Sequence, residues 1–377
     1  MIYFDNAATS FRKPPSVAAA VLDAMRSAAS VGRGGHPPAM NAAKSVDRCR
    51  TLLARLFDCT PEQVAFTMNA THALNIAIKS LVPPGGRAVI SGFEHNAVVR
   101  PLHALGAETV ICGTALFDDD RMLEEFEKAL QTPANAVICT QVSNVFGYRL
   151  PVERLARLCE DRGVPLIVDA SQSAGVLPIS FRKLGACMIA MPGHKGLYGP
   201  QGTGVLLCRE MPKPLMEGGT GSLSVSEEMP DFLPDRLEAG THNVCGIAGL
   251  AAGVQFVTEN TPERIGSHER GICSILHRRL DGTKDIRCYW GAQHNQVGVL
   301  SVVPENCDCE VAAQMLGEYG CCVRAGLHCA PLAHKSAGTL ETGTIRFSPS
   351  CFSTAADAEE AAELLLFVLQ KAKYGFF

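Results

Sequence analysis

A glycine-rich loop with a single lysine is the most constraining feature of this sequence. Residues 191–204 hold Lys195 among five glycines, and apolar runs at residues 186–191 and 204–208, typical of buried strands, flank the loop. Glycines let a backbone approach a ligand closely, and a lysine between buried strands is poorly solvated, which favours the neutral amine that attacks an aldehyde. The alternative is a surface loop with a solvated lysine. The loop lacks the G-x-x-x-x-G-K-[ST] order, which disfavours a nucleoside triphosphate site.

A second motif carries a carboxylate upstream of this lysine. Residues 165–175 begin as an apolar strand that ends at Asp169, and Gln172 follows in the next turn. Ligands of α/β proteins bind at the C-terminal ends of such strands. A strand-end carboxylate and a loop lysine suit pyridoxal 5′-phosphate, because the lysine takes the aldehyde and the carboxylate keeps the pyridine nitrogen protonated. This strand and the Gly193-His-Lys195 loop resemble the fold-type I pyridoxal-phosphate enzymes, specifically the class V aminotransferase superfamily and its cysteine desulfurases.

Composition excludes several other classes of protein. The chain has 377 residues, 47% of them hydrophobic and 19% charged, with a net charge of −4. These values predict a soluble protein with a large core and without the basic surface that nucleic acid requires. The first ten residues lack the pattern of a signal peptide, and no apolar run is long enough to span a membrane, so we expect a cytoplasmic protein.

Sixteen cysteines are scattered along the chain, which indicates reduced thiols rather than a disulfide framework. Cys307, Cys309, Cys321, Cys322 and Cys329 cluster in the sequence. Their spacing matches no metal-ligand pattern, so we predict no metal site, with an iron–sulfur site as the alternative.

Apolar strands alternate with amphipathic helices up to about residue 208, which predicts a mainly parallel sheet with helices on both faces. One of the early helices is expected at residues 41–57, with Asn41 as its cap. The resemblance implies a seven-stranded sheet in which residues 204–208 run antiparallel. It also implies a large cofactor-binding domain at residues 15–257 and a smaller α+β domain at residues 258–377, with residues 1–14 packed near the latter.

Two helix starts are candidate cofactor contacts. A strand at residues 63–67 leads into a helix whose first turn holds Ala70 and Thr71, and free N–H groups there favour an anion such as a phosphate. Alternatively, Thr71 only caps the helix. His95 begins the next helix, where a histidine is often just a cap. The resemblance implies that the His95 ring stacks on the cofactor.

Other assignments rest on the resemblance alone. It implies that Asn144 contacts both cofactor and substrate carboxylate, and that Gln172 and His194 also bind the cofactor. Thr241 would reach the phosphate of a partner subunit, which implies a homodimer with shared active sites. A loop with Arg33 is expected at the mouth of the site. Two positions depart from the family pattern, since Pro192 replaces a common serine and Gly196 is an additional residue.

The segment before residue 332 resembles the Arg-x-Gly-x-His-Cys-Ala loop of the short-loop, group II cysteine desulfurases, which makes Cys329 the nucleophile. His328 and Arg324 are expected to lower the pKa of its thiol. Alternatively, Cys329 is one more thiol among sixteen. Arg346 is implied to pair with the α-carboxylate of the substrate. A solvated strand arginine is the alternative.

These residues predict a pyridoxal-phosphate-dependent cysteine desulfurase. L-cysteine would give L-alanine and a persulfide on Cys329, which passes to a protein sulfur acceptor, for example in iron–sulfur cluster biogenesis. Lys195, Cys329 and His95 would be catalytic. The alternatives are a selenocysteine lyase, another class V lyase or aminotransferase, and a non-catalytic scaffold. Cys329 separates the first hypothesis from the others, because a transaminase or simple lyase does not use it.

Overall fold

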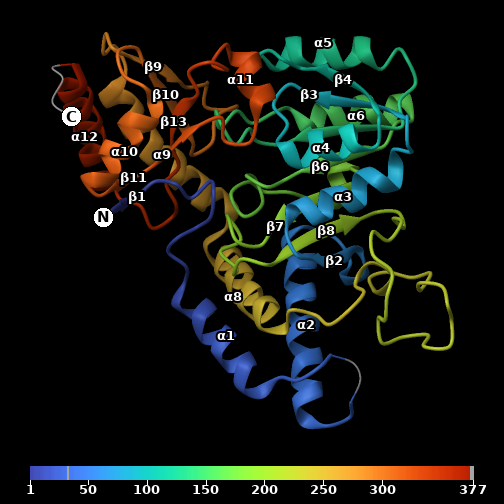
Figure 1. Ribbon diagram of the computed structural model, residues 1–377. Coiled ribbons are helices and arrows are strands. Elements are labelled where there is room, and N and C mark those ends of the chain that lie inside the picture. Colours follow the sequence, from blue (N-terminus) through green and yellow to red (C-terminus); the bar gives the residue numbers. More distant parts are fainter. Residues whose placement is uncertain (32–33, 374–377) are drawn as a thin grey trace.

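The structure is a computed structural model, and it describes residues 1–31 and 34–373. Seven strands between residues 64 and 208 form one sheet (Figure 1). In spatial order they are β2 (Val64–Thr67), β8 (Gly204–Cys208), β7 (Met188–Pro192), β6 (Leu166–Asp169), β5 (Ala136–Thr140), β3 (Arg87–Ser91) and β4 (Glu108–Cys112). The strands from β7 to β4 are parallel to one another, whereas β8 is antiparallel to both of its neighbours. The predicted fold, including the antiparallel strand at residues 204–208, is confirmed.

Successive residues of these strands point to opposite faces of the sheet, and both faces are apolar. Val89 belongs to the core on one face, and its neighbours Ala88 and Ile90 belong to the core on the other. Helices cover both faces for this reason. One face carries α3 (Ala70–Leu81) and α4 (Asn96–Ala104). The other carries α2 (Pro37–Leu56), α5 (Asp119–Ala129), α6 (Val152–Arg162), α7 (Phe181–Leu184) and α8 (Val244–Asn260). Helix α1 (Pro15–Ser27) packs on α8 and α2.

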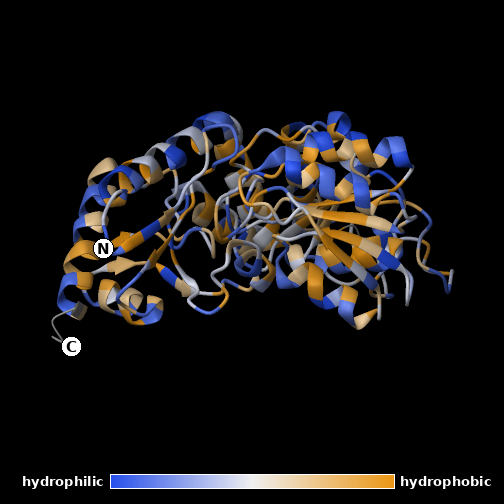
Figure 2. Cartoon of the chain, turned by 90° about the horizontal axis from the view of Figure 1, so that it is seen from above, coloured by the Kyte–Doolittle hydropathy of each residue, from blue (hydrophilic) through white to orange (hydrophobic). Residues whose placement is uncertain are grey.

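A second lobe follows α8. Its sheet is antiparallel with the order β12-β13-β10-β9, and helices enclose an apolar core of their own against it. Its strands are β9 (Ile286–Tyr289), β10 (Leu300–Pro304), β12 (Arg324–Gly326) and β13 (Thr344–Phe347). Its helices are α9 (Pro262–Leu280), α10 (Cys309–Glu318), α11 (Pro331–Ala337) and α12 (Ala355–Lys373). Figure 2 shows the two lobes side by side, each with apolar strands inside. We keep the limits 15–257 and 258–377 as a proposed division into domains.

The N-terminal segment joins the second lobe. Strand β1 (Ile2–Tyr3) pairs in parallel with β11 (Cys321–Cys322), and Phe4 is fully buried in the core of that lobe. The chain then crosses to the large sheet before α1 begins. The first residues therefore contact both lobes.

One predicted helix start is wrong. Asn41 was expected to cap α2, but the helix begins at Pro37, and the His36 side chain accepts a hydrogen bond from the Ala39 N–H. Prolines are tolerated in the first turn because its N–H groups lack helical partners. The predicted mouth residue Arg33 lies outside the described residues.

Between β8 and α8 the chain forms a long loop that extends away from the sheet (Figure 1). No helix within residues 1–31 and 34–373 is long and apolar enough to cross a membrane.

Candidate active site

The C-terminal ends of β5, β6 and β7 surround a cavity of about 110 Å³. Strand β6 ends at Asp169 and β7 ends at Pro192, so the loops that follow bring their polar residues to the same edge of the sheet. The cavity is lined by eight of the predicted residues, namely Ala70, Thr71, His95, Asn144, Asp169, Gln172, His194 and Lys195. Residues far apart in the sequence therefore meet at one place.

Lys195 and Asp169 form the polar centre of this cavity. Burial lowers the pKa of Lys195 to about 8, an effect that the Asp169 carboxylate opposes. The Asp169 side chain is itself oriented by Ser171, whose backbone N–H and hydroxyl both donate to Oδ1. A solvated surface lysine, the alternative reading, is inconsistent with this burial.

The first turn of α3 presents free backbone donors to the cavity. Asn69 is the cap of this helix, because its side chain accepts from the His72 N–H at 2.9 Å. Thr71 is thus not the cap, and that alternative is wrong. Because the first N–H groups of a helix lack intrahelical acceptors, those of Ala70 and Thr71 remain available for an anion.

His95 both caps a helix and lines the cavity, the two positions considered for it from the sequence. Its Nδ1 accepts from the Ala97 N–H at 3.0 Å, so the ring caps α4. The ring also lines the cavity, and burial lowers its pKa while Asp169 opposes that shift. With Nδ1 occupied as an acceptor, the neutral ring carries its proton on Nε2.

The Cys329 thiol is exposed on a loop held against the large sheet. His328 and Cys329 have φ of 49° and 57°, left-handed values that non-glycine residues rarely adopt. Two hydrogen bonds keep the loop in this shape: Asn144 Nδ2 donates to the His328 carbonyl, and the Asn96 N–H donates to the Cys329 carbonyl, each at 2.8 Å. The second bond brings Cys329 to the residue that follows His95.

The expected role of His328 is wrong. Its ring is buried, and Nε2 lies 3.2 Å from the carbonyl and 3.1 Å from the hydroxyl of Thr344. Burial, together with the charge of Arg346, lowers the His328 pKa to about 2. A neutral imidazole supplies no positive charge to the adjacent Cys329.

Arg346 is almost completely buried, with 1% of its surface exposed. Its Nη1 donates to the Asn144 carbonyl at 2.9 Å, and its Nη2 forms an ion pair with Asp5 Oδ1 at 2.7 Å. The solvated strand arginine is therefore excluded. Asp5 was missed in the sequence, where the only signal was a polar pair after the short strand at residues 2–3.

The N-terminal segment also contacts the large lobe at two predicted residues. Gln172 Nε2 donates to the Ala7 carbonyl at 3.0 Å, and His194 Nδ1 lies 3.0 Å from the Thr9 hydroxyl. The His194 carbonyl accepts from both the N–H and the hydroxyl of Ser10. Residues 5–10 therefore border the cavity from outside the sheet.

Glu94 is a second residue that the sequence analysis missed. It is fully buried, its Oε1 accepts from the Thr140 N–H at 2.7 Å, and burial raises its pKa to about 8. This carboxyl group ties the loop that bears His95 to the end of β5. Its position directly before His95 was the only available signal.

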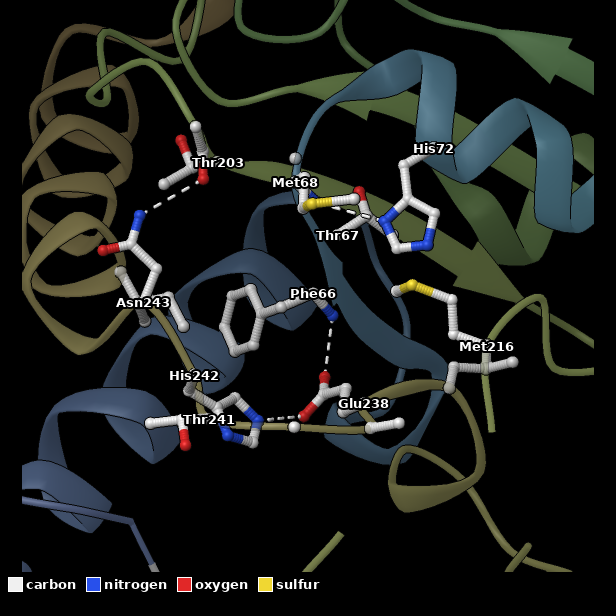
Figure 3. Close-up of a pocket in the computed structure, with 16 residues that line it drawn as sticks. Phe66, Thr67, Met68, His72, Thr203, Met216, Glu238, Thr241, His242 and Asn243 are labelled. Carbon is white, nitrogen blue, oxygen red and sulfur yellow. Dashed lines mark hydrogen bonds and ion pairs between the residues drawn. The ribbon is translucent and has the colours of Figure 1, made fainter. Parts of the chain in front are cut away.

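Thr241 does not reach the Lys195 cavity within one chain. It lies exposed at the edge of a separate cavity of about 200 Å³ (Figure 3). The loop is anchored there by buried Glu238, which accepts from Arg50 and from the Phe66 N–H and contacts His242 at 2.6 Å. Thr241 thus lines a different cavity from Lys195 in the same chain.

Comparisons with known proteins identify the family. A model of the class-V aminotransferases matches residues 2–361. A probable cysteine desulfurase of Methanothermobacter thermautotrophicus is 32% identical, with 97% of this chain and 94% of the relative covered. A probable cysteine desulfurase of Pyrococcus abyssi is 29% identical, with 95% of this chain and 92% of the relative covered.

This chain is a class-V aminotransferase family member.

Solved structures agree with this assignment. The apo cysteine desulfurase of Thermococcus onnurineus superposes with a TM-score of 0.89 at 29% identity, covering 98% of this chain and 94% of that one. A cysteine desulfurase of Escherichia coli superposes with a TM-score of 0.86 at 26% identity, and again 98% of this chain and 94% of that one are covered.

Class-V family members use pyridoxal 5′-phosphate, and the residues of the cavity fit this cofactor. They combine an amine whose pKa burial has lowered, a strand-end carboxylate and the free N–H groups of a helix start. These are the groups that the aldehyde, the pyridine nitrogen and the phosphate require.

The structure accounts for one of the two departures from the family pattern. A Cβ atom on Gly196 would lie 2.4 Å from the Ala174 carbonyl oxygen, so only glycine fits where the lysine loop crosses residues 174–175. Pro192 lines the cavity without an N–H donor, whereas the start of α3 has free N–H groups. The cysteines clustered between residues 307 and 329 form no metal-binding group in the described part of the chain.

Proposed function

We propose that this protein is a cysteine desulfurase that converts L-cysteine to L-alanine and collects the sulfur as a persulfide on Cys329. The observation that carries the proposal is an exposed thiol on a loop fixed beside the Lys195 cavity. The names of the relatives support the same activity. An aminotransferase, a simple lyase or a scaffold would have no use for this thiol.

Pyridoxal phosphate bound to Lys195 would accept electrons from the substrate carbon atoms. Asp169 would keep the pyridine nitrogen protonated, and the His95 ring would cover the cofactor face. Ala70 and Thr71 would hold the phosphate with their N–H groups, and Gln172 and His194 would hold the remainder of the cofactor. All seven residues line the same cavity, which supports this division of roles.

Two groups are suited to move protons during the reaction. Lys195 would take the Cα proton of the substrate, and its lowered pKa makes the neutral amine accessible. His95 exchanges a proton with the substrate thiol through Nε2, since Nδ1 is engaged in capping α4.

Substrate binding and sulfur transfer involve Arg346, Asn144 and Cys329. Arg346 binds the α-carboxylate, with Asn144 beside it. The Cys329 thiolate attacks the substrate sulfur, so that an S–S bond forms while the C–S bond breaks. The electron pair of the C–S bond remains with carbon, which takes up protons to become L-alanine, and the persulfide then passes to a protein acceptor.

We further propose a cytoplasmic homodimer that supplies sulfur for iron–sulfur clusters. Thr241 of each subunit would contact the phosphate in the other, which agrees with its absence from the lining of the Lys195 cavity of its own chain. All sixteen cysteines are free thiols, as expected in a reducing compartment.

The test is incubation of the purified holoenzyme with L-cysteine, with assays for L-alanine and for the mass of one added sulfur atom on Cys329. Cys329→Ala should keep the cofactor and lose essentially all alanine formation, because no thiolate attacks the sulfur. Cys351→Ala is the matched control and should retain most activity. Wild-type turnover of L-cysteine by Cys329→Ala would disprove the proposal.

A further inference from the structure

The guanidinium of Arg346, which we assign to binding the substrate carboxylate, already forms an ion pair with Asp5. Arg346 has 1% of its side chain exposed, and Asp5 has 22%. Arg324 is the cross-strand partner of Arg346 and repels it electrostatically, whereas Asp5 attracts it. A buried guanidinium without a counter-charge is costly, so Asp5 stabilises Arg346.

The guanidinium nitrogen that Asp5 uses determines how a second carboxylate can bind to Arg346. A guanidinium binds a carboxylate bidentately through either Nη1 and Nη2 or Nε and Nη2, because the side chain itself blocks the third edge. Both edges include Nη2, and Asp5 accepts from Nη2. Nη1 already donates to the Asn144 carbonyl. A bidentate carboxylate ligand therefore shares Nη2 with Asp5, and the two negative charges repel each other.

The backbone around Asp5 is held independently of this ion pair. The Phe4 N–H donates to the Cys322 carbonyl, and the Asn6 N–H donates to the Ser348 carbonyl. The Asn6 side chain also donates to Ser348. Removing the charge of Asp5 should consequently leave the N-terminal segment in place.

We propose that Asp5 is a specificity-determining residue, an internal carboxylate that competes with the substrate carboxylate for Arg346. A simple carboxylate gains too little at Arg346 to displace Asp5. An α-amino acid also engages the cofactor through its amino group and therefore wins the competition. The inference rests on the proposed role of Arg346 in the desulfurase reaction.

The test compares wild-type holoenzyme with Asp5→Asn, which keeps the shape and an acceptor oxygen but loses the charge. The probe is 3-mercaptopropionate, which has the thiol and carboxylate of cysteine but no amino group, and its binding is measured by calorimetry. We expect Asp5→Asn to bind it about 3- to 10-fold more tightly and to lower KM for L-cysteine with little change in kcat. Cysteamine, which lacks the carboxylate, should bind both proteins equally.

Glu310→Gln is the matched control, because Glu310 is an exposed carboxylate near Gly326. It should leave the affinity for 3-mercaptopropionate unchanged. Unchanged or weaker binding by Asp5→Asn would mean that Asp5 only orients Arg346 and would overturn the proposal. If Asp5→Asn does not fold, Asp5→Ser provides the same comparison, and failure of both to fold would also overturn it. The probe needs no turnover, so a wild-type enzyme inactive on L-cysteine would refute the desulfurase assignment separately.

Discussion

Lys195 shows how burial changes the chemistry of a single side chain. A free lysine has a pKa near 10.4, so at neutral pH almost none of it is the neutral nucleophile. Burial brings the pKa of Lys195 to about 8, which raises the neutral fraction by more than a hundredfold. This residue is therefore ready to react with an aldehyde under physiological conditions.

The lowered pKa predicts the pH dependence of cofactor capture. In the cofactor-free protein, the rate of covalent attachment of pyridoxal phosphate should rise with pH and level off above about pH 8, because the neutral amine dominates there. Absorbance kinetics measure the rate, and borohydride reduction followed by peptide mass analysis should locate the label on Lys195. Lys183, which is exposed outside the cavity, is an internal control and should carry little of the label. A rate that keeps rising toward about pH 10.4 would contradict the effect of burial.

At the scale of single residues, the sequence indicated which residues belong to the candidate site better than it indicated their contacts. Lys195, Asp169 and His95 stand at strand ends or helix starts, and such positions can be read from local periodicity. The neutral state of His328 depends on burial and on the charge of Arg346, and the ion pair of Arg346 depends on Asp5. Neither partner is close in the sequence, so no local pattern indicates these interactions.

The start of α3 depends on the neighbouring strand β8. A Cβ atom on Gly204 would lie 2.6 Å from the backbone carbon of Asn69, the cap of α3. Gly204→Ala should therefore displace the N–H groups of Ala70 and Thr71 and weaken binding of pyridoxal phosphate about tenfold or more.

Gly271→Ala is the control for this substitution. A Cβ atom on Gly271 would meet nothing within 4 Å, and in helix α9 alanine should stabilise the protein by about 0.5–1 kcal/mol. Fluorescence titration with the cofactor and thermal melting measure the two effects. Unchanged cofactor affinity in Gly204→Ala would show that β8 does not position the proposed phosphate site.

Helix α9 carries a buried carboxyl group that should make stability depend on pH. Glu269 is 7% exposed, and burial raises its pKa to about 8, with the Tyr198 hydroxyl at 3.4 Å as its hydrogen-bond donor. The folded state retains this proton to higher pH than the unfolded state. The contribution of Glu269 is therefore fully present below about pH 4.5 and is lost as the pH rises to about 8.

Glu269→Gln should remove this dependence, because glutamine does not ionise. Between about pH 5 and about pH 8.5, the free energy of unfolding of the wild type should fall relative to that of the variant, by an amount on the order of a few kcal/mol. Urea denaturation at both pH values provides the measurement. Parallel pH profiles for the two proteins would show that Glu269 ionises normally in the folded state.

Elements were predicted well where apolar periodicity is strong and poorly where it is weak. Strands β5, β6, β7 and β8 of the large sheet are buried, mainly apolar runs, and their positions were evident. The start of α2 was missed because Pro37 and Pro38 resemble a turn, although they occupy the first helical turn.

At the scale of the whole molecule, the N-terminal segment connects the two lobes around the candidate site. Asp5 contacts the second lobe through Arg346, whereas Ala7 and Ser10 contact the large lobe through Gln172 and His194. The order of the motifs along the chain did not reveal this connection, because it depends on how the chain crosses between the lobes. Arg346, the proposed binding residue for the substrate carboxylate, is thereby linked physically to the loop that holds Lys195.

The proposed dimer with shared active sites leads to a test by subunit mixing. If Thr241 serves the partner's phosphate, a Thr241→Asp subunit spoils the other site by placing a negative charge near that phosphate, and its own site stays intact when its partner supplies Thr241. A Lys195→Ala subunit supplies that threonine but has no nucleophile of its own. Each pure variant should be inactive, and a hybrid dimer should contain one complete site.

Random re-pairing of equal amounts of the two variants makes half of the dimers hybrid, so desulfuration of L-cysteine should recover to at most about one quarter of the wild-type rate. Lys195→Ala mixed with Cys329→Ala is the matched control. The Cys329 loop binds the Asn96 N–H of its own chain, so neither site of that hybrid is complete, and no activity should return. If Thr241 acted within its own chain, the first mixture would also stay inactive, because each subunit would then carry one defect in its own site.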